Sequence, residues 1–205
     1  MAVTLTTPNT LLGAFQPKGD AARLATNVVT VVLGALLITI AAKISVPVWP
    51  VPVTLQSFAI AGLAAAFGWR IGVATVALYL LEGAAGLPVF AGAGAGIPYL
   101  MGPTGGFLLG FLIFAAIIGA AADRGASSKP LALFGAMLVA EVVLLAIGFT
   151  WLLLLSGQAG WIDQSNVLVS AFDGAIRPFI IWDVLKMALA ALTVTGAWGM
   201  FSAKR

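Results

Sequence analysis

Two oppositely charged residues, Asp183 and Lys186, lie inside the apolar segment IIWDVLKMALAALTVTG at positions 180–196. Residues three positions apart share one face of a helix, so we expect the carboxylate and the ammonium side by side. A Lys donates up to three hydrogen bonds and a carboxylate accepts several, so the pair suits a small ligand with both acceptors and N–H donors. The alternative is an ion pair that only fixes helix packing, although buried pairs often barely offset their desolvation.

Other polar side chains could join this site from several segments. The predicted binding set is completed by Gln56, Tyr99, Trp182 and Arg177. Tyr99 and Trp182 are included because aromatic rings could stack on a flat ligand. Lys43 could also reach the site. Glu141 lies within a long apolar stretch, where it is either a proton-linked group or a carboxylate satisfied by a neighbouring helix.

The elements that must position these residues belong to a membrane protein. The chain has 205 residues, of which 61% are hydrophobic and 8% charged, and its mean hydropathy is +1.11. Globular proteins average about 25% charged residues. We therefore predict an all-α integral membrane protein, with a single transmembrane substrate-binding domain over residues 1–205. Its six apolar segments are predicted at 21–43, 55–69, 71–90, 105–122, 131–155 and 178–201.

Basic residues predict the orientation of these six transmembrane helices. Cytoplasmic loops carry an excess of Lys and Arg. With both termini cytoplasmic, most basic residues fall on that side: Lys18, Arg23, Arg70, Arg124, Lys129, Lys204 and Arg205. Two segments rich in Pro or Gly, 44–57 and 83–106, then lie outside. Irregular backbone at membrane depth is tolerated where it lines a cavity, so we expect these loops to cover an outward-facing pocket, unless they are plain connectors.

The composition excludes several kinds of chemistry. The chain contains no Cys and no His, which excludes thiol nucleophiles, imidazole bases and zinc-finger sites. We predict no catalytic residues, no metal site and no cofactor. The net charge of +3 is too small and too dispersed to suggest nucleic acid. No Walker sequence occurs, so any ATP hydrolysis that drives this protein belongs to another subunit.

Four segments together resemble a known family. VPVWPVPVTLQSFAI, YLLEGAAGLPVFAG, GPTGGFLLGF and WDVLKM are similar, in order and spacing, to the signature segments of BioY proteins. These proteins are the biotin-specific substrate-binding (S) components of energy-coupling factor (ECF) transporters. The similarity covers roughly residues 40–120 and 178–200. GPTGG alone is modest support, whereas the ordered set is highly specific.

The resemblance implies a six-helix protein of the bacterial plasma membrane that captures biotin on its outer side. In the family, the D-x-x-K pair of the last helix belongs to the binding site, which corresponds to Asp183 and Lys186. The loop between the third and fourth helices acts as a lid, and its predicted residues are Gly86, Leu87, Pro88, Val89, Phe90 and Gly102.

The resemblance also implies partner subunits. An alanine-spaced patch on the first helix docks against the transmembrane T component, whose module includes two ATPases. Ala21 and Ala25 match this patch and have the small-xxx-small spacing that lets another helix approach closely.

Two other function classes stay open. An ion-coupled secondary transporter of a small anionic vitamin or metabolite would use Glu141 to couple proton movement to the substrate. An intramembrane hydrolase would have to rely on Ser and Lys, and the sequence offers no convincing nucleophile and base pair.

Overall fold

The structure is a computed structural model, and it describes residues 9–158 and 162–202. Lys204 and Arg205, which were predicted to be cytoplasmic, lie outside the described residues. The helices are α1 (Leu11–Ala14), α2 (Asp20–Lys43), α3 (Gln56–Phe67), α4 (Trp69–Ala84), α5 (Gly96–Leu100), α6 (Gly105–Asp123), α7 (Pro130–Leu155), α8 (Val167–Ala175) and α9 (Ile180–Ser202). Two short 3-10 turns, η1 (Ala126–Ser128) and η2 (Ser156–Gln158), flank α7. Strands β1 (Ser45–Val46) and β2 (Val53–Thr54) form an antiparallel hairpin.

Within the described residues, four helical stretches are long and apolar enough to cross a membrane: Asp20–Lys43, Gly105–Asp123, Pro130–Leu155 and Val167–Phe201. The first three match predicted segments closely, and the last combines α8 with α9. The other two predicted segments, 55–69 and 71–90, form shorter helices than expected. Helix α3 has 12 residues and α4 has 16, whereas a full span needs about 20.

The predicted helix over 71–90 ends early, at Ala84. Gly86 adopts a φ of +97°, in the left-handed region that only glycine enters readily. Pro88 follows and has no backbone N–H to continue a helix. Residues 85–95 therefore form an irregular loop beside the bundle, and the last part of the predicted segment is loop rather than helix.

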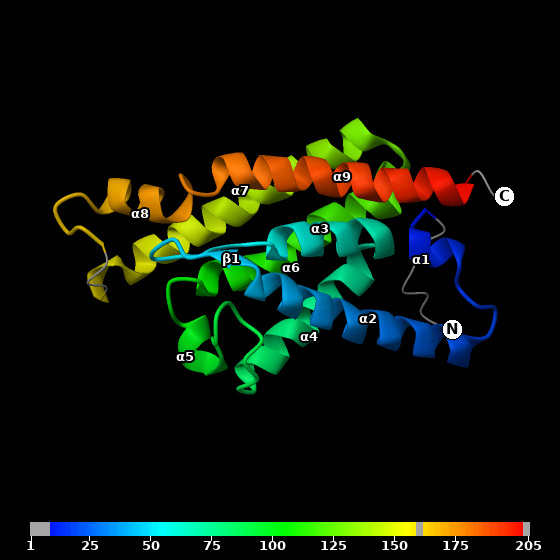
Figure 1. Cartoon of the computed structure of the whole chain (residues 1–205), viewed down its shortest axis with the longest axis horizontal. Coiled ribbons are helices and arrows are strands. Elements are labelled where there is room, and N and C mark those ends of the chain that lie inside the picture. Colours follow the sequence, from blue (N-terminus) through cyan, green and yellow to red (C-terminus); the bar gives the residue numbers. More distant parts are fainter. Residues whose placement is uncertain (1–8, 159–161, 203–205) are drawn as a thin grey trace.

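The long helices run roughly side by side in an elongated bundle (Figure 1). The start of α2, the α3–α4 link, the α6–α7 link and the end of α9 gather at one end. Hydrogen bonds join these segments there: Trp69 N to Asp123 Oδ2 at 3.4 Å, and Ser127 Oγ to the Ala65 carbonyl at 2.7 Å. The β-hairpin, α5, α8 and the loop after α4 occupy the opposite end.

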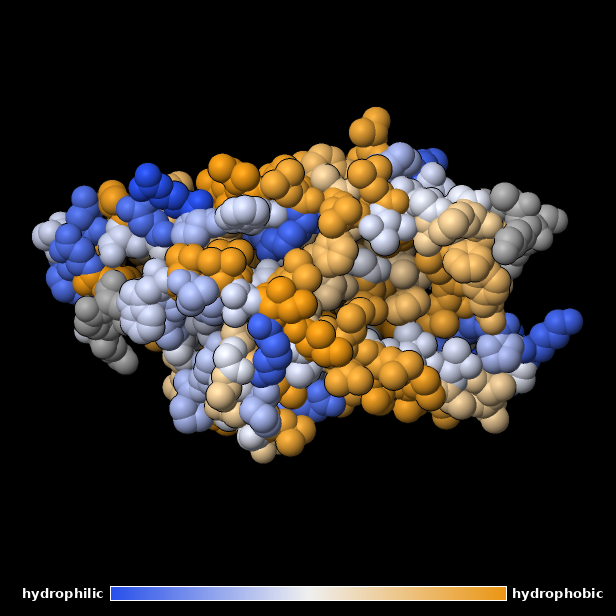
Figure 2. Space-filling model, in the orientation of Figure 1, coloured by the Kyte–Doolittle hydropathy of each residue, from blue (hydrophilic) through white to orange (hydrophobic). Residues whose placement is uncertain are grey.

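The surface is apolar around the middle of the bundle. Hydrophobic residues form a broad area there, whereas hydrophilic residues gather toward the two ends (Figure 2). Helix α2 contributes many exposed aliphatic side chains, among them Leu24, Val28, Val32, Leu36 and Ile40. A surface of this kind is suited to lipid rather than water.

Small residues let the central helices approach closely. A Cβ added at Gly72 of α4 would lie 3.1 Å from the Ala64 Cα of α3. At Gly119 of α6 it would run into the backbone N and Cα of Trp69. Glycine is therefore needed where α6 crosses the start of α4, as is common when helices pack in a membrane.

Candidate binding site

A cavity lies inside the bundle near the end that carries the hairpin and α5. Both irregular loops contribute to its wall, with Val51 and Pro52 from one and Ala91 and Tyr99 from the other. The remaining lining residues come from β2, the helices and the turns just before α6 and α9: Thr54, Gln56, Ser57, Thr104, Phe107, Leu108, Phe111, Glu141, Leu144, Leu145, Phe179, Asp183 and Lys186. The wall is thus mostly apolar, with a few polar groups, which is typical of a small-molecule site.

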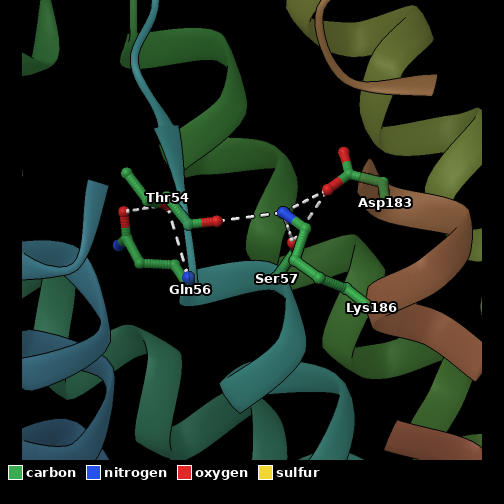
Figure 3. A network of polar contacts seen from close by, with 5 residues as sticks. All are labelled: Thr54, Gln56, Ser57, Asp183 and Lys186. Atoms are coloured by element: carbon green, nitrogen blue, oxygen red, sulfur yellow. Dashed lines mark hydrogen bonds and ion pairs between the residues drawn. The ribbon is translucent and has the colours of Figure 1, made fainter. Parts of the chain in front are cut away.

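Asp183 and Lys186 form an ion pair in this wall, on one face of α9 as the sequence predicts. The Lys186 ammonium also donates to the Thr54 carbonyl at 2.9 Å and to Ser57 Oγ at 2.8 Å (Figure 3). Ser57 Oγ in turn donates to Asp183 Oδ1 at 3.3 Å. All three Lys186 protons therefore have protein partners, and the second Asp183 oxygen points away from this network.

Asp183 lies in the first turn of α9, about 5 Å along the axis from Ile180. It is only 3% exposed. The N-terminal end of a helix carries a partial positive charge that favours a carboxylate. The helix end and the Lys186 ammonium thus both compensate this buried negative charge.

Gln56 lines the cavity, but its side chain is held by protein partners. Its Oε1 accepts from the Thr54 hydroxyl at 3.0 Å, and its Nε2 donates to the Tyr79 hydroxyl at 2.8 Å. The Tyr79 hydroxyl donates onward to the Val89 carbonyl at 3.3 Å. Gln56 therefore links the cavity wall to the loop after α4.

That loop is anchored by Lys43 at the end of α2. The Lys43 ammonium donates to three loop carbonyls, those of Pro88 at 2.5 Å, Phe90 at 2.7 Å and Gly92 at 2.8 Å. Lys43 does not line the cavity. Its ammonium group instead holds the loop in place.

Aromatic contacts hold the same loop on its inner side, and a second anchor holds the link between α5 and α6. The Phe90 ring stacks on Tyr99 at 5.1 Å and meets the edge of Tyr79 at 5.5 Å. Trp151 Nε1 donates to the Gly102 carbonyl at 2.9 Å. Of the predicted lid residues, Val89 and Phe90 are buried, whereas Leu87 is exposed.

Glu141 of α7 faces the cavity and is 4% exposed. Both of its carboxylate oxygens are buried, and no residue in 9–158 or 162–202 gives either of them a hydrogen bond. The charged groups that act on it are Asp183 and Lys186 of α9. The Glu141 and Asp183 side chains are close enough for a hydrogen bond when one of the two carboxyls carries a proton, which agrees with the alternative that a neighbouring helix satisfies Glu141.

Two predicted binding residues lie away from the cavity. Trp182 is 60% exposed, because its position next to Asp183 turns it about 100° around α9. Arg177 pairs with Asp173 at 3.3 Å on the outer surface, and its side chain is 75% exposed. Neither residue lines the cavity, so the structure does not bring them together with the other predicted site residues. Asp183, Lys186, Gln56 and Tyr99 do line it.

The prediction missed several lining residues. Thr54 and Ser57 lie within two residues of Gln56 in the sequence, where β2 leads directly into α3. Their closeness to Gln56 could have predicted that they also line the cavity. Phe107, Phe111 and Phe179 supply much of the apolar wall. Their aromatic type gave no signal, because aromatic residues are common in any membrane helix.

The arrangement can bind and orient a ligand. In the part of the chain that the structure describes, no group of three or more acidic residues is placed to hold a metal ion. The polar groups in the wall are an ion pair, a second carboxyl, hydroxyls and an amide. Such groups recognise a small molecule by hydrogen bonds, while the apolar wall buries the rest of it.

Known proteins resemble this chain in sequence and in fold. The Biotin transporter BioY of Thermotoga maritima is 36% identical over 167 residues, which cover 76% of this chain and 86% of that protein. The Probable biotin transporter BioY of Pyrococcus horikoshii is 34% identical over 168 residues, covering 82% and 93%. The Biotin transporter BioY2 of Lactococcus lactis subsp. cremoris is 33% identical over 162 residues, covering 79% and 84%.

The fold is also similar to a crystal structure of the S-component for biotin from an ECF-type ABC transporter. The TM-score is 0.73 at 22% sequence identity, and the match covers 86% of this chain and 93% of the other. A family model for BioY matches residues 12–203. The chain therefore belongs to the BioY family.

Proposed function

We propose that this protein is the biotin-capturing S component of an ECF-type uptake transporter and has no catalytic activity of its own. The observation that carries the proposal is the Asp183–Lys186 pair in an otherwise mainly apolar cavity that two irregular loops border. Membership of a family whose relatives are named biotin transporters supports this choice of ligand.

Biotin fits the chemistry of this cavity. It has a cyclic ureido group with N–H donors and a carbonyl acceptor, a thioether and an apolar chain that ends in a carboxylate. Asp183 can accept from a ureido N–H through the oxygen that points away from Lys186 (Figure 3). Lys186 can donate to a ligand acceptor by exchanging one of its protein partners. The phenylalanine-rich wall suits the apolar remainder.

The proposed topology has six transmembrane helices, with both termini on the cytoplasmic side of the plasma membrane. Helices α3 and α4 are too short to span alone and would rely on their neighbours for burial. Arg23, Arg70, Arg124 and Lys129 lie on segments that meet at one end of the bundle (Figure 1). The positive-inside rule makes this end cytoplasmic and the cavity end external.

The proposed partners are a transmembrane T component and two ATPase subunits. Ala21 and Ala25 lie one turn apart on α2 and are both exposed, which allows a partner helix to approach closely. They lie at the end of the bundle opposite the cavity, so docking there would leave the binding site uncovered.

An Ala21→Trp, Ala25→Trp variant is expected to lose co-purification with the T component of the same organism, because two indoles prevent close helix approach. Its affinity for biotin should be unchanged. Ala132→Trp, at an exposed position of α7, is the matched control. Retention of the T component by the α2 variant would contradict this docking face.

A Lys43→Met variant is expected to release biotin about tenfold faster, since hydrogen bonds to a charged group contribute about 1.5 to 3 kcal/mol and solvent weakens exposed ones. The measurement is a chase of bound labelled biotin with excess unlabelled biotin. Lys129→Met, at the opposite end, controls for loss of a surface charge. Equal release rates would show that the Lys43 anchor does not retain the ligand.

The function itself is tested by calorimetric titration of biotin into the detergent-purified protein, followed by uptake assays in vesicles. Tight binding is expected, and concentrative uptake should need the partner subunits and ATP. Uptake driven by a pH gradient alone would favour the ion-coupled transporter, in which Glu141→Gln abolishes transport. Absence of binding by folded protein would refute the choice of ligand.

A further inference from the structure

A second carboxyl group, that of Glu141 on α7, lies beside Asp183. The two side chains are within hydrogen-bond reach of each other, and α7 packs against α9. Glu141 is 4% exposed and Asp183 is 3% exposed, and no other acidic residue that the structure describes is buried. Two ionised carboxylates that close repel each other strongly when water is excluded, so one of the pair carries a proton.

The surroundings of the two carboxyls assign this proton to Glu141. Asp183 pairs with the Lys186 ammonium and accepts from Ser57 Oγ at 3.3 Å. It also lies in the first turn of α9, where the helix end favours a negative charge. Glu141 lies near the middle of α7, and neither of its oxygens accepts a hydrogen bond from any described residue. The charge therefore belongs to Asp183, and Glu141 is the donor.

Glu141 acts from behind the cavity wall. Both of its oxygens are inaccessible to solvent, so its carboxyl group can influence a ligand only through Asp183. An ionised carboxylate offers about four lone-pair sites for hydrogen bonds. Lys186 and Ser57 occupy two of them and a protonated Glu141 occupies a third, which leaves one acceptor site of Asp183 for the ligand.

The same proton determines the net charge of the site. With Glu141 neutral, the charges of Asp183 and Lys186 cancel. With Glu141 ionised, the three groups would carry one net negative charge, and they would repel an anionic ligand in surroundings of low dielectric constant. The proposed ligand ends in a carboxylate, so a neutral site favours its capture.

We infer that Glu141 is a positioning residue that holds a proton, donates a hydrogen bond to Asp183 and thereby fixes the carboxylate that accepts from the ligand. The inference rests on the proposed function and deepens it. A hydrogen bond from a carboxylic acid to a carboxylate is charge-assisted and roughly twice as strong as a neutral one. It restrains rotation of the Asp183 carboxylate, which Lys186 and Ser57 hold mainly at one oxygen.

The test compares two substitutions at Glu141. Glu141→Gln keeps an N–H donor of nearly the same size, whereas Glu141→Met removes the donor. Val142→Met places the same new side chain at a neighbouring position that is 67% exposed. Each purified protein is titrated calorimetrically with biotin.

Infrared spectra of the same proteins without ligand detect a protonated carboxyl by its C=O stretch. The spectra are repeated with glutamate that carries carbon-13 in its side-chain carboxyl, which distinguishes a proton on Glu141 from one on Asp183. Glu82 is the only other glutamate of the chain, and it is retained in every variant.

Wild type at neutral pH is expected to show a protonated-carboxyl band that shifts to lower frequency with the labelled glutamate. The band should be absent from Glu141→Gln and from Glu141→Met. Glu141→Gln should bind biotin nearly as tightly as wild type, and Glu141→Met about tenfold more weakly, because only the second variant loses the hydrogen bond to a charged group. Val142→Met should match wild type in both measurements.

Three results would overturn the inference. Absence of the label-sensitive band from wild type would show that Glu141 is ionised. Equal losses of affinity in the Gln and Met variants would show that a donor to Asp183 is not what binding requires. Undiminished affinity in Glu141→Met would show that Asp183 needs no positioning. Failure of wild type to bind biotin would instead refute the proposed function, and the infrared band, recorded without ligand, would still report the proton.

Discussion

Replacement of Lys186 by Met is expected to weaken biotin binding by about 2 to 5 kcal/mol, the usual cost of truncating one partner of a buried charge pair. That range corresponds to roughly 30-fold to several-thousand-fold in Kd. Lys186 would donate to the ligand, and without it Asp183 is left as an uncompensated charge at 3% exposure. Calorimetric titration of the purified variant measures the effect.

A double variant separates binding from folding. Asp183→Asn with Lys186→Met removes both charges, so it should recover stability lost by the single variant without recovering biotin affinity. Arg177→Ala is the matched control, because its guanidinium pairs with Asp173 outside the cavity, and its Kd should stay within about twofold of wild type. A comparable loss in Arg177→Ala would refute the assignment of the cavity as the site.

Gly119→Ala is expected to be strongly destabilising. Its Cβ would run into the backbone N and Cα of Trp69 and lie 2.7 Å from the carbonyl carbon of Gly68. Backbone cannot rotate away as a side chain can, so α6 and α4 must separate. Overpacking typically costs about 1 to 3 kcal/mol, occasionally more, and thermal unfolding in detergent reports the loss.

The control for that change is Gly135→Ala on α7, where an added Cβ meets no atom within 4 Å. Its unfolding temperature should equal that of wild type or exceed it, since alanine is the better helix former. Similar losses in both variants would show that the close crossing of α6 over α4 is not the cause of the effect.

Sequence patterns predicted the long helices well and the loops poorly. Helices α2, α6 and α7 follow from uninterrupted apolar runs of sufficient length. The end of α4 was missed because the letters LPVF at 87–90 are as apolar as a helix. Gly86 and Pro88 are the local signals that end the helix, whereas the path of the loop is held by Lys43, a contact 45 to 49 residues away in the chain, which no local pattern contains.

The part of the binding site that lies on a single helix could be predicted from helix geometry alone. Asp183 and Lys186 share a face because their spacing requires it. The same geometry could have excluded Trp182, which lies one residue from Asp183 and therefore points elsewhere. For Glu141, the sequence gives the position but not its neighbours, because these depend on how α7 packs against α9.

The Lys43 anchor also affects the thermodynamics of ligand capture. With three carbonyls fixed by one ammonium, the loop of residues 85–95 loses its configurational entropy when the protein folds rather than when the ligand arrives. Ordering a residue costs roughly 1 to 2 kcal/mol, so a loop ordered in advance favours tight binding with a small entropic penalty. In Lys43→Met that penalty would shift to the binding step, and calorimetry would record it as a less favourable binding entropy.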